Sequence, residues 1–109
     1  MKVEIPLRTV STANSREHWA VKAKRTKSER EAAYYATPTG LRVPLRVKLT
    51  RMGPRKLDTD NLAISLKGVR DGIADKCNID DGCDLIKFEY AQEKSKQYGV
   101  RMEFMPWVS

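Results

Sequence analysis

The expected fold of this chain depends most on one stretch, Leu57 to Asp84, which reads LDTDNLAISLKGVRDGIADKCNIDDGCD. Its middle has helical spacing, because apolar residues recur at steps of three and four: Leu62, Leu66, Val69 and Ile73. This spacing predicts one continuous helix, from Asp60 to about Lys76, that buries an apolar stripe. Lys67 and Asp71 follow Asp60 by seven and eleven residues, which is close to two and three whole turns of a helix. The three side chains are therefore expected to share a second face of this helix.

Acidic residues stand at both ends of the predicted helix. Asp58 and Asp60 precede it, and the adjacent pair Asp80 and Asp81 follows it. Grouped carboxylates repel one another, and a cation relieves that repulsion. All-oxygen ligand sets suit hard divalent ions, above all Mg²⁺ or Mn²⁺. The pattern therefore indicates a metal site that could act on phosphates.

A structural interpretation of the same carboxylates stays open beside the metal site. Aspartate is among the commonest helix N-caps, and an Asp-Asp-Gly run is common in turns. Two observations favour the metal. One carboxylate suffices for a cap, yet Asp58 and Asp60 flank the same point, and the chain around them is strongly basic.

The charge is distributed unevenly along the 109 residues. The chain carries 21 basic and 14 acidic side chains, a net charge of +7. Residues 1–57 hold 14 Lys and Arg against 4 Glu, whereas residues 58–109 hold 7 Lys and Arg against 10 acids. A basic surface around an acidic site favours a polyanionic partner such as DNA. The alternative is that the basic excess only keeps the protein soluble.

Two basic segments are the candidate DNA contacts. Lys22 and Arg25 lie in a helix predicted from Ser15 to about Ala36, whose basic face either contacts phosphates or is simply solvated. The loop before Asp58 is a candidate for phosphate positioning, and its basic residues are Arg51, Arg55 and Lys56. Arg70, in the central predicted helix, is included among these candidates.

Alternation of apolar and polar residues predicts four strands, at about residues 2–10, 41–50, 85–92 and 98–105. With the two helices the order is β-α-β-α-β-β. Residues 1–109 are thus expected to form one small α/β (α+β) domain, a sheet of about four strands with helices packed on one face. Pro6 predicts an edge strand, and Pro44 an edge or a bulge. A tight polar connection would pair the last two strands as an antiparallel hairpin.

Several function classes are disfavoured. No apolar run is long enough to span a bilayer and the N-terminus has no signal-peptide core, so a cytoplasmic protein is expected. Cys77 and Cys83 lack metal-site spacing, and a disulfide between them is not expected in a reducing cytoplasm. The single His18 excludes mechanisms that need paired histidines.

The combined motifs resemble the RusA family of Holliday junction resolvases. The matching pieces follow a basic loop and are Asp58-Thr59-Asp60-Asn61-Leu62, Lys67-Gly68-Val69-Arg70-Asp71 and Ile79-Asp80-Asp81. The resemblance implies a small homodimeric endonuclease, common in phages and prophages, that uses Mg²⁺ to cut four-way DNA junctions during recombination and repair.

Site residues are carried over from this resemblance one by one. Three aspartates, Asp58, Asp60 and Asp81, would be the catalytic metal ligands, with Asp80 as a helper. Lys67 would be the catalytic lysine. It departs from the family pattern, because it lies seven residues after Asp60 rather than four, about 4.5 Å further along a helix.

Three other interpretations remain open. The same metal site could act on flaps or other branched DNA. A basic DNA-binding protein without catalysis would use its carboxylates only as a helix cap. A small scaffold for another protein would show neither cleavage nor salt-sensitive DNA binding.

Overall fold

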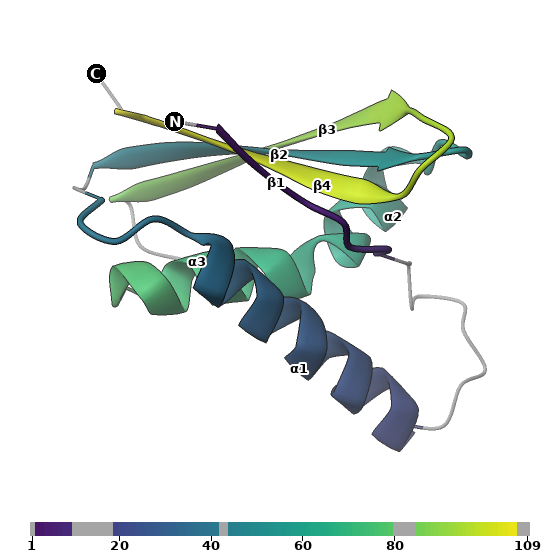
Figure 1. The fold of residues 1–109 in the computed structure, drawn as a ribbon, viewed down its shortest axis with the longest axis horizontal. Coiled ribbons are helices and arrows are strands. Elements are labelled where there is room, and N and C mark those ends of the chain that lie inside the picture. The colour runs from purple at the N-terminus through teal and green to yellow at the C-terminus, as the bar shows by residue number, and fades with distance from the viewer. Residues whose placement is uncertain (1, 10–18, 42–43, 80–84, 107–109) are drawn as a thin grey trace.

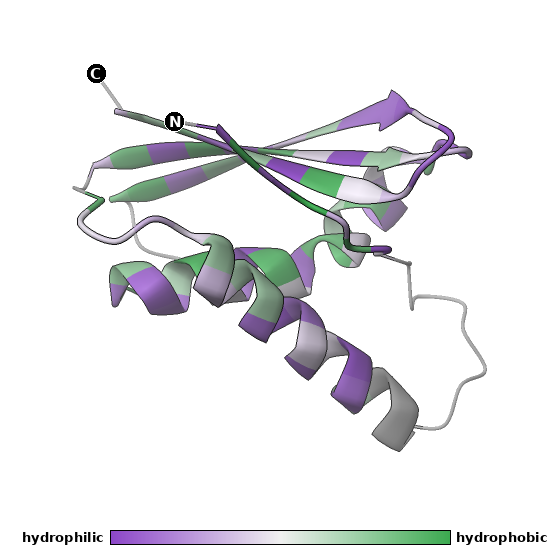
Figure 2. Ribbon diagram, viewed as in Figure 1, coloured by the Kyte–Doolittle hydropathy of each residue, from purple (hydrophilic) through white to green (hydrophobic). Residues whose placement is uncertain are grey.

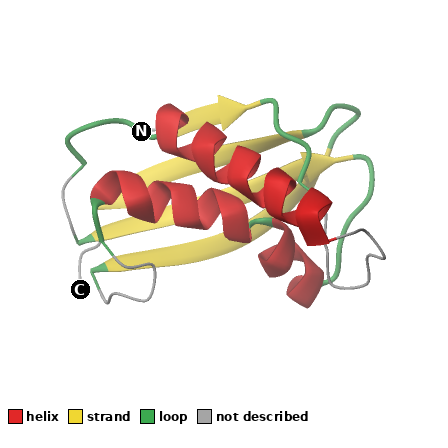
Figure 3. Ribbon diagram, turned by 90° about the horizontal axis from the view of Figure 1, so that it is seen from below, coloured by secondary structure: helices red, strands yellow, loops and turns green. Residues whose placement is uncertain are grey.

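Four strands and three helices form the part of the chain that the computed structural model describes, residues 2–9, 19–41, 44–79 and 85–106. The strands are β1 (Lys2–Ile5), β2 (Leu45–Gly53), β3 (Ile86–Lys94) and β4 (Gly99–Pro106). The helices are α1 (Trp19–Ala36), α2 (Thr59–Ser65) and α3 (Lys67–Cys77). All three helices pack against one face of a single mixed sheet (Figures 1 and 3). The predicted α+β domain is confirmed.

The sheet has the order β1-β4-β2-β3. β2 pairs in parallel with β3 and antiparallel with β4, and β4 pairs antiparallel with β1. It follows that β1, β2 and β3 all run in the same direction. We call the edge at which they end, at Ile5, Gly53 and Lys94, the carboxyl edge. The other end of the sheet, where β2 and β3 begin, is the amino edge.

The predicted hairpin between the last two strands is wrong. β3 and β4 lie on opposite sides of β2, so the connection 95–98 crosses the end of that strand over about 10 Å, two strand spacings. The Ser95 amide donates to the Gly53 carbonyl at 2.8 Å. A Cβ on Gly53 would lie 3.3 Å from the Tyr98 ring, so the missing side chain leaves room for the crossing.

The prolines behave differently in the two strands. β1 is an edge strand as predicted, and Pro6 follows it directly. β2 is an interior strand, so the edge position predicted from Pro44 is wrong. The pairing of β2 begins at Leu45, one residue after Pro44. Pro44 therefore removes no hydrogen bond from the ladder.

The single helix predicted from Asp60 to Lys76 is wrong as well, because the chain breaks it at Leu66. The backbone there leaves the helical region, with φ −101° and ψ 4°. The Ser65 hydroxyl donates to the Leu62 carbonyl at 2.8 Å, a local bond that competes with the helical ladder. Lys67 begins a new helix, so its direction cannot be counted from Asp60.

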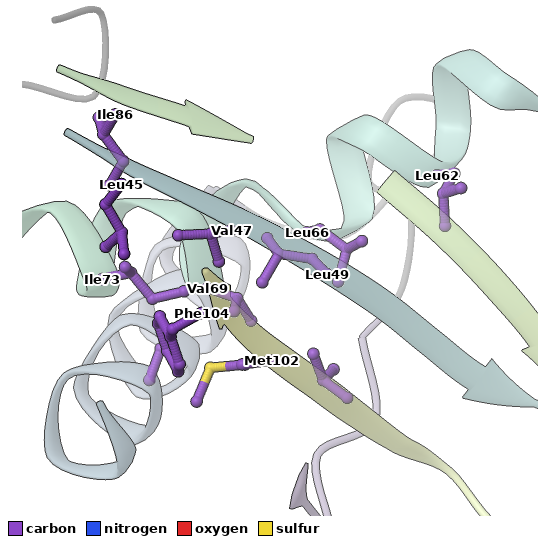
Figure 4. Close-up of a cluster of buried hydrophobic side chains, with 12 residues drawn as sticks. Leu45, Val47, Leu49, Leu62, Leu66, Val69, Ile73, Ile86, Met102 and Phe104 are labelled. Carbon is purple, nitrogen blue, oxygen red and sulfur yellow. The ribbon is translucent and has the colours of Figure 1, made fainter. Parts of the chain in front are cut away.

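The core lies between the sheet and the helices (Figure 4). Leu66, Val69 and Ile73 are fully buried, and the strands supply the facing residues Leu45, Val47, Leu49, Met102 and Phe104. These are the residues that the apolar spacing predicted to be inside. Figure 2 shows that the middle of α1, by contrast, is mostly hydrophilic. No helix in the described ranges is long and apolar enough to cross a membrane.

Candidate functional site at the carboxyl edge of the sheet

Three segments that carry polar side chains leave the sheet at its carboxyl edge. They are residues 6–9 after β1, residues 54–58 after β2, and the connection 95–98 after β3. Within the sheet, Ile5, Val100, Arg51 and Gln92 stand side by side in register. The ends of parallel strands are where open α/β sheets bind their ligands.

The loop before Asp58 is held at both ends by side chains of the sheet. Arg51 Nη1 donates to the Arg55 carbonyl at 2.9 Å. The side chain of Gln92 makes two hydrogen bonds to the backbone of Leu57. Its Nε2 donates to the Leu57 carbonyl at 2.6 Å, and its Oε1 accepts from the Leu57 N–H at 2.8 Å. Two bonds to one residue act as a clamp, so the position of the neighbouring Asp58 is set by β3.

Asp58 is the N-cap of α2. Its backbone is extended, its Oδ1 accepts from the Asn61 amide at 3.2 Å, and its carbonyl accepts from the Leu62 amide at 2.9 Å. Asp60 lies in the first turn of the same helix, and both carboxylates are exposed. The cap interpretation of Asp58 is thus confirmed, and the exposed Asp60 is not needed for it.

Arg51 was predicted to contact DNA at the surface, but its side chain is buried. Only 6% of the residue is exposed, and its Nε points to the Thr9 carbonyl at 3.4 Å. Burial lowers the pKa of the Arg51 guanidinium and the positive charge of Arg8 lowers it further, whereas Tyr98 acts in the opposite direction. The buried Arg51 side chain therefore links Thr9 to Arg55 by hydrogen bonds to the backbone carbonyls of both residues.

The remaining basic candidates of this region are exposed. Arg55 and Lys56 project from the loop between β2 and α2, close in sequence to Asp58. Lys67 is exposed in the first turn of α3. Arg55 and Lys56 thus lie at the same edge as the Asp58–Asp60 pair, and their role in positioning a phosphate stays a prediction.

Three other predicted contacts lie elsewhere. Arg70 is half-buried between α3 and β3, where its Nη1 donates to the Tyr90 hydroxyl at 3.0 Å. Arg25 is half-buried and acts by its charge on Glu29 of the same helix. Lys22 belongs to α1, but its side chain lies outside the described part of the molecule.

Asp80 and Asp81 also fall outside the described residues. The residues that flank them, Ile79 and Leu85, lie away from Asp58. Leu85 is at the amino edge, where its carbonyl accepts from the Leu45 amide at 2.8 Å, and Ile79 follows the end of α3. The structure therefore brings Asp58 and Asp60 together and leaves the predicted contribution of Asp81 undescribed. Cys77, just before this segment, is a free thiol.

The described carboxylates allow a limited test of fit to a metal. Within residues 2–9, 19–41, 44–79 and 85–106, no three Asp, Glu, His or Cys side chains are grouped to hold an ion. Mg²⁺, however, is usually bound by one or two carboxylates together with waters and substrate phosphates. The exposed pair Asp58 and Asp60, next to Arg55 and Lys56, fits an ion that arrives with a phosphate.

The uncovered face of the sheet is not a continuous basic surface. Arg46 pairs with Glu89 at 3.5 Å, and Arg101 pairs with Glu4 at 2.9 Å and Glu93 at 2.8 Å. The outward residues of β2 include Arg46 and Lys48. Acidic residues from the neighbouring strands compensate that charge, so this face offers little net attraction to a polyanion.

Sequence analysis overlooked four residues of the carboxyl edge: Arg8, Thr9, Gln92 and Tyr98. All four were assigned to predicted strands, Arg8 and Thr9 within residues 2–10, Gln92 at the end of 85–92 and Tyr98 at the start of 98–105. The only signal that could have drawn attention to them is topological. Parallel strands bring such residues to one edge, and the sequence alone did not show the strand order.

Comparisons with known proteins add no identity to these observations. No family model matches the chain, and no curated protein or solved structure matches it either.

Proposed function

We propose that this protein is a metal-dependent DNA endonuclease that hydrolyses phosphodiester bonds in branched DNA, with the four-way junction as its substrate. The observation that carries the proposal is the juxtaposition of Asp58 and Asp60 with the exposed cations Arg55 and Lys56 at the carboxyl edge. The resemblance of the motifs to RusA resolvases supports the choice of substrate, and with it a homodimer.

Each described residue has a distinct role in this proposal. Asp60 would hold Mg²⁺ or Mn²⁺ together with Oδ2 of Asp58, the carboxylate oxygen that is not used in the helix cap. The bound ion would supply charge neutralisation and an activated water. Arg55 and Lys56 attract the phosphodiester and offset charge on its oxygens. Gln92 and Arg51 are positioning residues, because they hold the loop that carries these groups. Lys67 remains a candidate at the start of α3.

The test is cleavage of a labelled four-way junction, beside a flap and a linear duplex, with Mg²⁺, with Mn²⁺ and with a chelator. Asp60→Asn and Asp81→Asn run in parallel with the unchanged protein. We expect paired cuts in the junction that need the metal and that disappear in Asp60→Asn, and loss of the cuts in Asp81→Asn would assign Asp81 the catalytic role that the resemblance implies. Because Asp60 is exposed and not part of the cap, loss of activity in Asp60→Asn would not reflect loss of the helix.

A second function is favoured by one observation, the confirmed role of Asp58 as an N-cap. If the carboxylates serve only the helix, the protein is a basic DNA-binding protein without catalysis. Junction binding without cleavage in either metal would support this second function and overturn the first. Cleavage of the flap in preference to the junction would keep the enzyme and change its substrate.

A further inference from the structure

Two arginines gather around Tyr98 at the carboxyl edge. The Arg8 guanidinium stacks on the Tyr98 ring, with its central carbon 4.6 Å from the ring centroid. Arg51 Nη1 and the Tyr98 ring each lie 3.3 Å from the point where a Cβ of Gly53 would be, so the two are close neighbours. Two positive groups thus share one aromatic side chain.

No carboxylate in the described ranges pairs with either arginine. Within the described part of the chain, Arg51 donates to the backbone carbonyls of Thr9 and Arg55 and to no carboxylate. A buried guanidinium without a counter-charge costs free energy, and a second cation beside it increases that cost. The cluster is therefore an electrostatic site for an anion.

A buried hydroxyl at the same place supplies an independent observation. Thr9 is 1% exposed, and its Oγ1 has no hydrogen-bond partner among the residues that the structure describes, although its own carbonyl accepts from Arg51 Nε at 3.4 Å. Buried hydroxyls nearly always find a partner, so the hydroxyl of a residue whose carbonyl contacts Arg51 is available for a further hydrogen bond. Such a hydroxyl would donate to an anion's oxygen.

The cluster reaches solvent through Arg8, which is exposed, whereas Arg51 and Thr9 are buried. Tyr98 also lines a hollow of about 370 Å³ between the end of β1 and the connection 95–98. The carboxylate that lines this hollow, Glu4, is already paired with Arg101 at 2.9 Å. Among the described residues the hollow is lined by Tyr98 and by neither arginine, so an anionic group approaches the cluster on the exposed side of Arg8.

We propose that Arg8, Arg51 and the Thr9 hydroxyl form a binding site for one backbone phosphate of a nucleic acid strand, beside Asp58 and Asp60. The nucleic acid as the source of the phosphate rests on the proposed function. The site holds a phosphate other than the one that would be cleaved, and so anchors the strand. Arg8 and Thr9 bind, and Arg51 both binds and holds the loop of Arg55.

The first experiment uses inorganic phosphate and the unchanged protein. The side-chain Nε–H signals of arginines are followed by NMR as phosphate replaces chloride at constant ionic strength. We expect the signals of Arg8 and Arg51 to shift with saturation, while those of Arg46 and Arg101 on the outer face stay in place. Equal shifts of all four would mean a general salt effect and would overturn the proposal.

Two variants test the site on DNA without catalysis. Arg8→Gln removes an exposed charge, and Thr9→Val removes the unpaired hydroxyl but keeps the shape. In a chelator, we expect each to bind the four-way junction roughly tenfold more weakly. Arg8→Gln should also lower the slope of log affinity against log salt by about one. The matched control Arg46→Gln should leave the affinity unchanged.

The outcomes separate this site from the proposed function. If Arg8→Gln and Thr9→Val both bind as the unchanged protein does, the phosphate site is wrong, whether or not the protein cleaves DNA. If the unchanged protein never cleaves but both variants lose affinity, the endonuclease fails and the phosphate site stands. Thr9→Val guards against misfolding, because replacing an unpaired buried hydroxyl by a methyl group should not destabilise the fold.

Discussion

Gly72 of α3 lies directly against the backbone of Arg30 in α1. A Cβ at Gly72 would come within 2.2 Å of the Arg30 carbonyl oxygen. One turn earlier, Gly68 meets Thr26 and Glu29 in the same way. The contacts advance together along both chains, so α1 and α3 run parallel, and Figure 3 shows them side by side under the sheet. Both helices therefore begin on the side of the carboxyl edge.

The close contact predicts a graded effect of adding one methyl group to α3. Gly72→Ala would place its Cβ into backbone, which cannot move aside, and we expect a loss of ~1–3 kcal/mol in the free energy of unfolding. Gly68→Ala meets chiefly the flexible end of Glu29, at 2.8 Å, and should cost less. Urea unfolding of both variants measures the difference. Equal stability of the two would show that the helices are not packed this closely.

A second prediction concerns the buried carboxyl of Glu29. The residue is 5% exposed, and burial raises its pKa to about 7, although the charge of Arg25 acts in the opposite direction. In the unfolded chain the group titrates near ~4.3. Between these values the folded state binds more protons, so the free energy of unfolding should fall by ~1–3 kcal/mol as the pH rises from about 4.5 to about 7.

Glu29→Gln should remove most of this slope and stabilise the protein above pH 7. The control is Glu31→Gln, an exposed glutamate of the same helix, which should keep the slope. Asp75 does not interfere. The hydrogen bond from Arg30 lowers the pKa of its carboxyl, so its contribution is lost only at pH values below about 4. A flat profile for the unchanged protein between pH 5 and 8 would contradict the prediction.

Local sequence patterns predicted the helices and strands, but they did not predict the order of the strands in the sheet or the break in the central helix. Alternation located β3 and β4 to within two residues and β2 to within four, because each buries one face of the sheet, whereas β1 ends at Ile5, five residues before the predicted end. The strand order was not predictable, because a polar connection such as 95–98 can close a hairpin or cross a strand, and the close approach of the Tyr98 ring to Gly53 is a contact that exists only in the fold. The break at Leu66 was missed for a related reason. The apolar stripe continues through it with unchanged spacing, while the Ser65 hydroxyl locally disrupts the ladder.

The candidate site was predicted only as far as it is local. Asp58 and Asp60 stand two residues apart, and the basic loop directly precedes them, so the sequence itself places these groups together. The burial of Arg51 was not foreseen, because its neighbours Thr9 and Arg55 meet it only through the fold. The role of Gln92 likewise depends on the parallel pairing of β2 with β3.

The clamp by Gln92 gives a third prediction. Gln92→Ala would remove both hydrogen bonds to Leu57 and release the loop that leads to Asp58. We expect a stability loss of ~1–2 kcal/mol and a larger loss of junction cleavage, because the carboxylates are no longer held in place. Urea unfolding and single-turnover cleavage at saturating DNA separate the two effects. Gln97→Ala, an exposed glutamine, is the matched control. Activity that falls only in proportion to the folded fraction would argue against a positioning role.

The fourth prediction separates the two roles proposed for Asp58. Asparagine caps helices as well as aspartate does but carries no charge, whereas alanine does neither. Asp58→Asn should therefore keep the stability of the unchanged protein and lose metal-dependent cleavage, with weaker Mn²⁺ binding measured by calorimetry. Asp58→Ala should lose the same activity and, in addition, ~0.5–2 kcal/mol of stability. If Asp58→Asn cleaves the junction normally, Asp58 serves only as a cap, and any metal must be held without it.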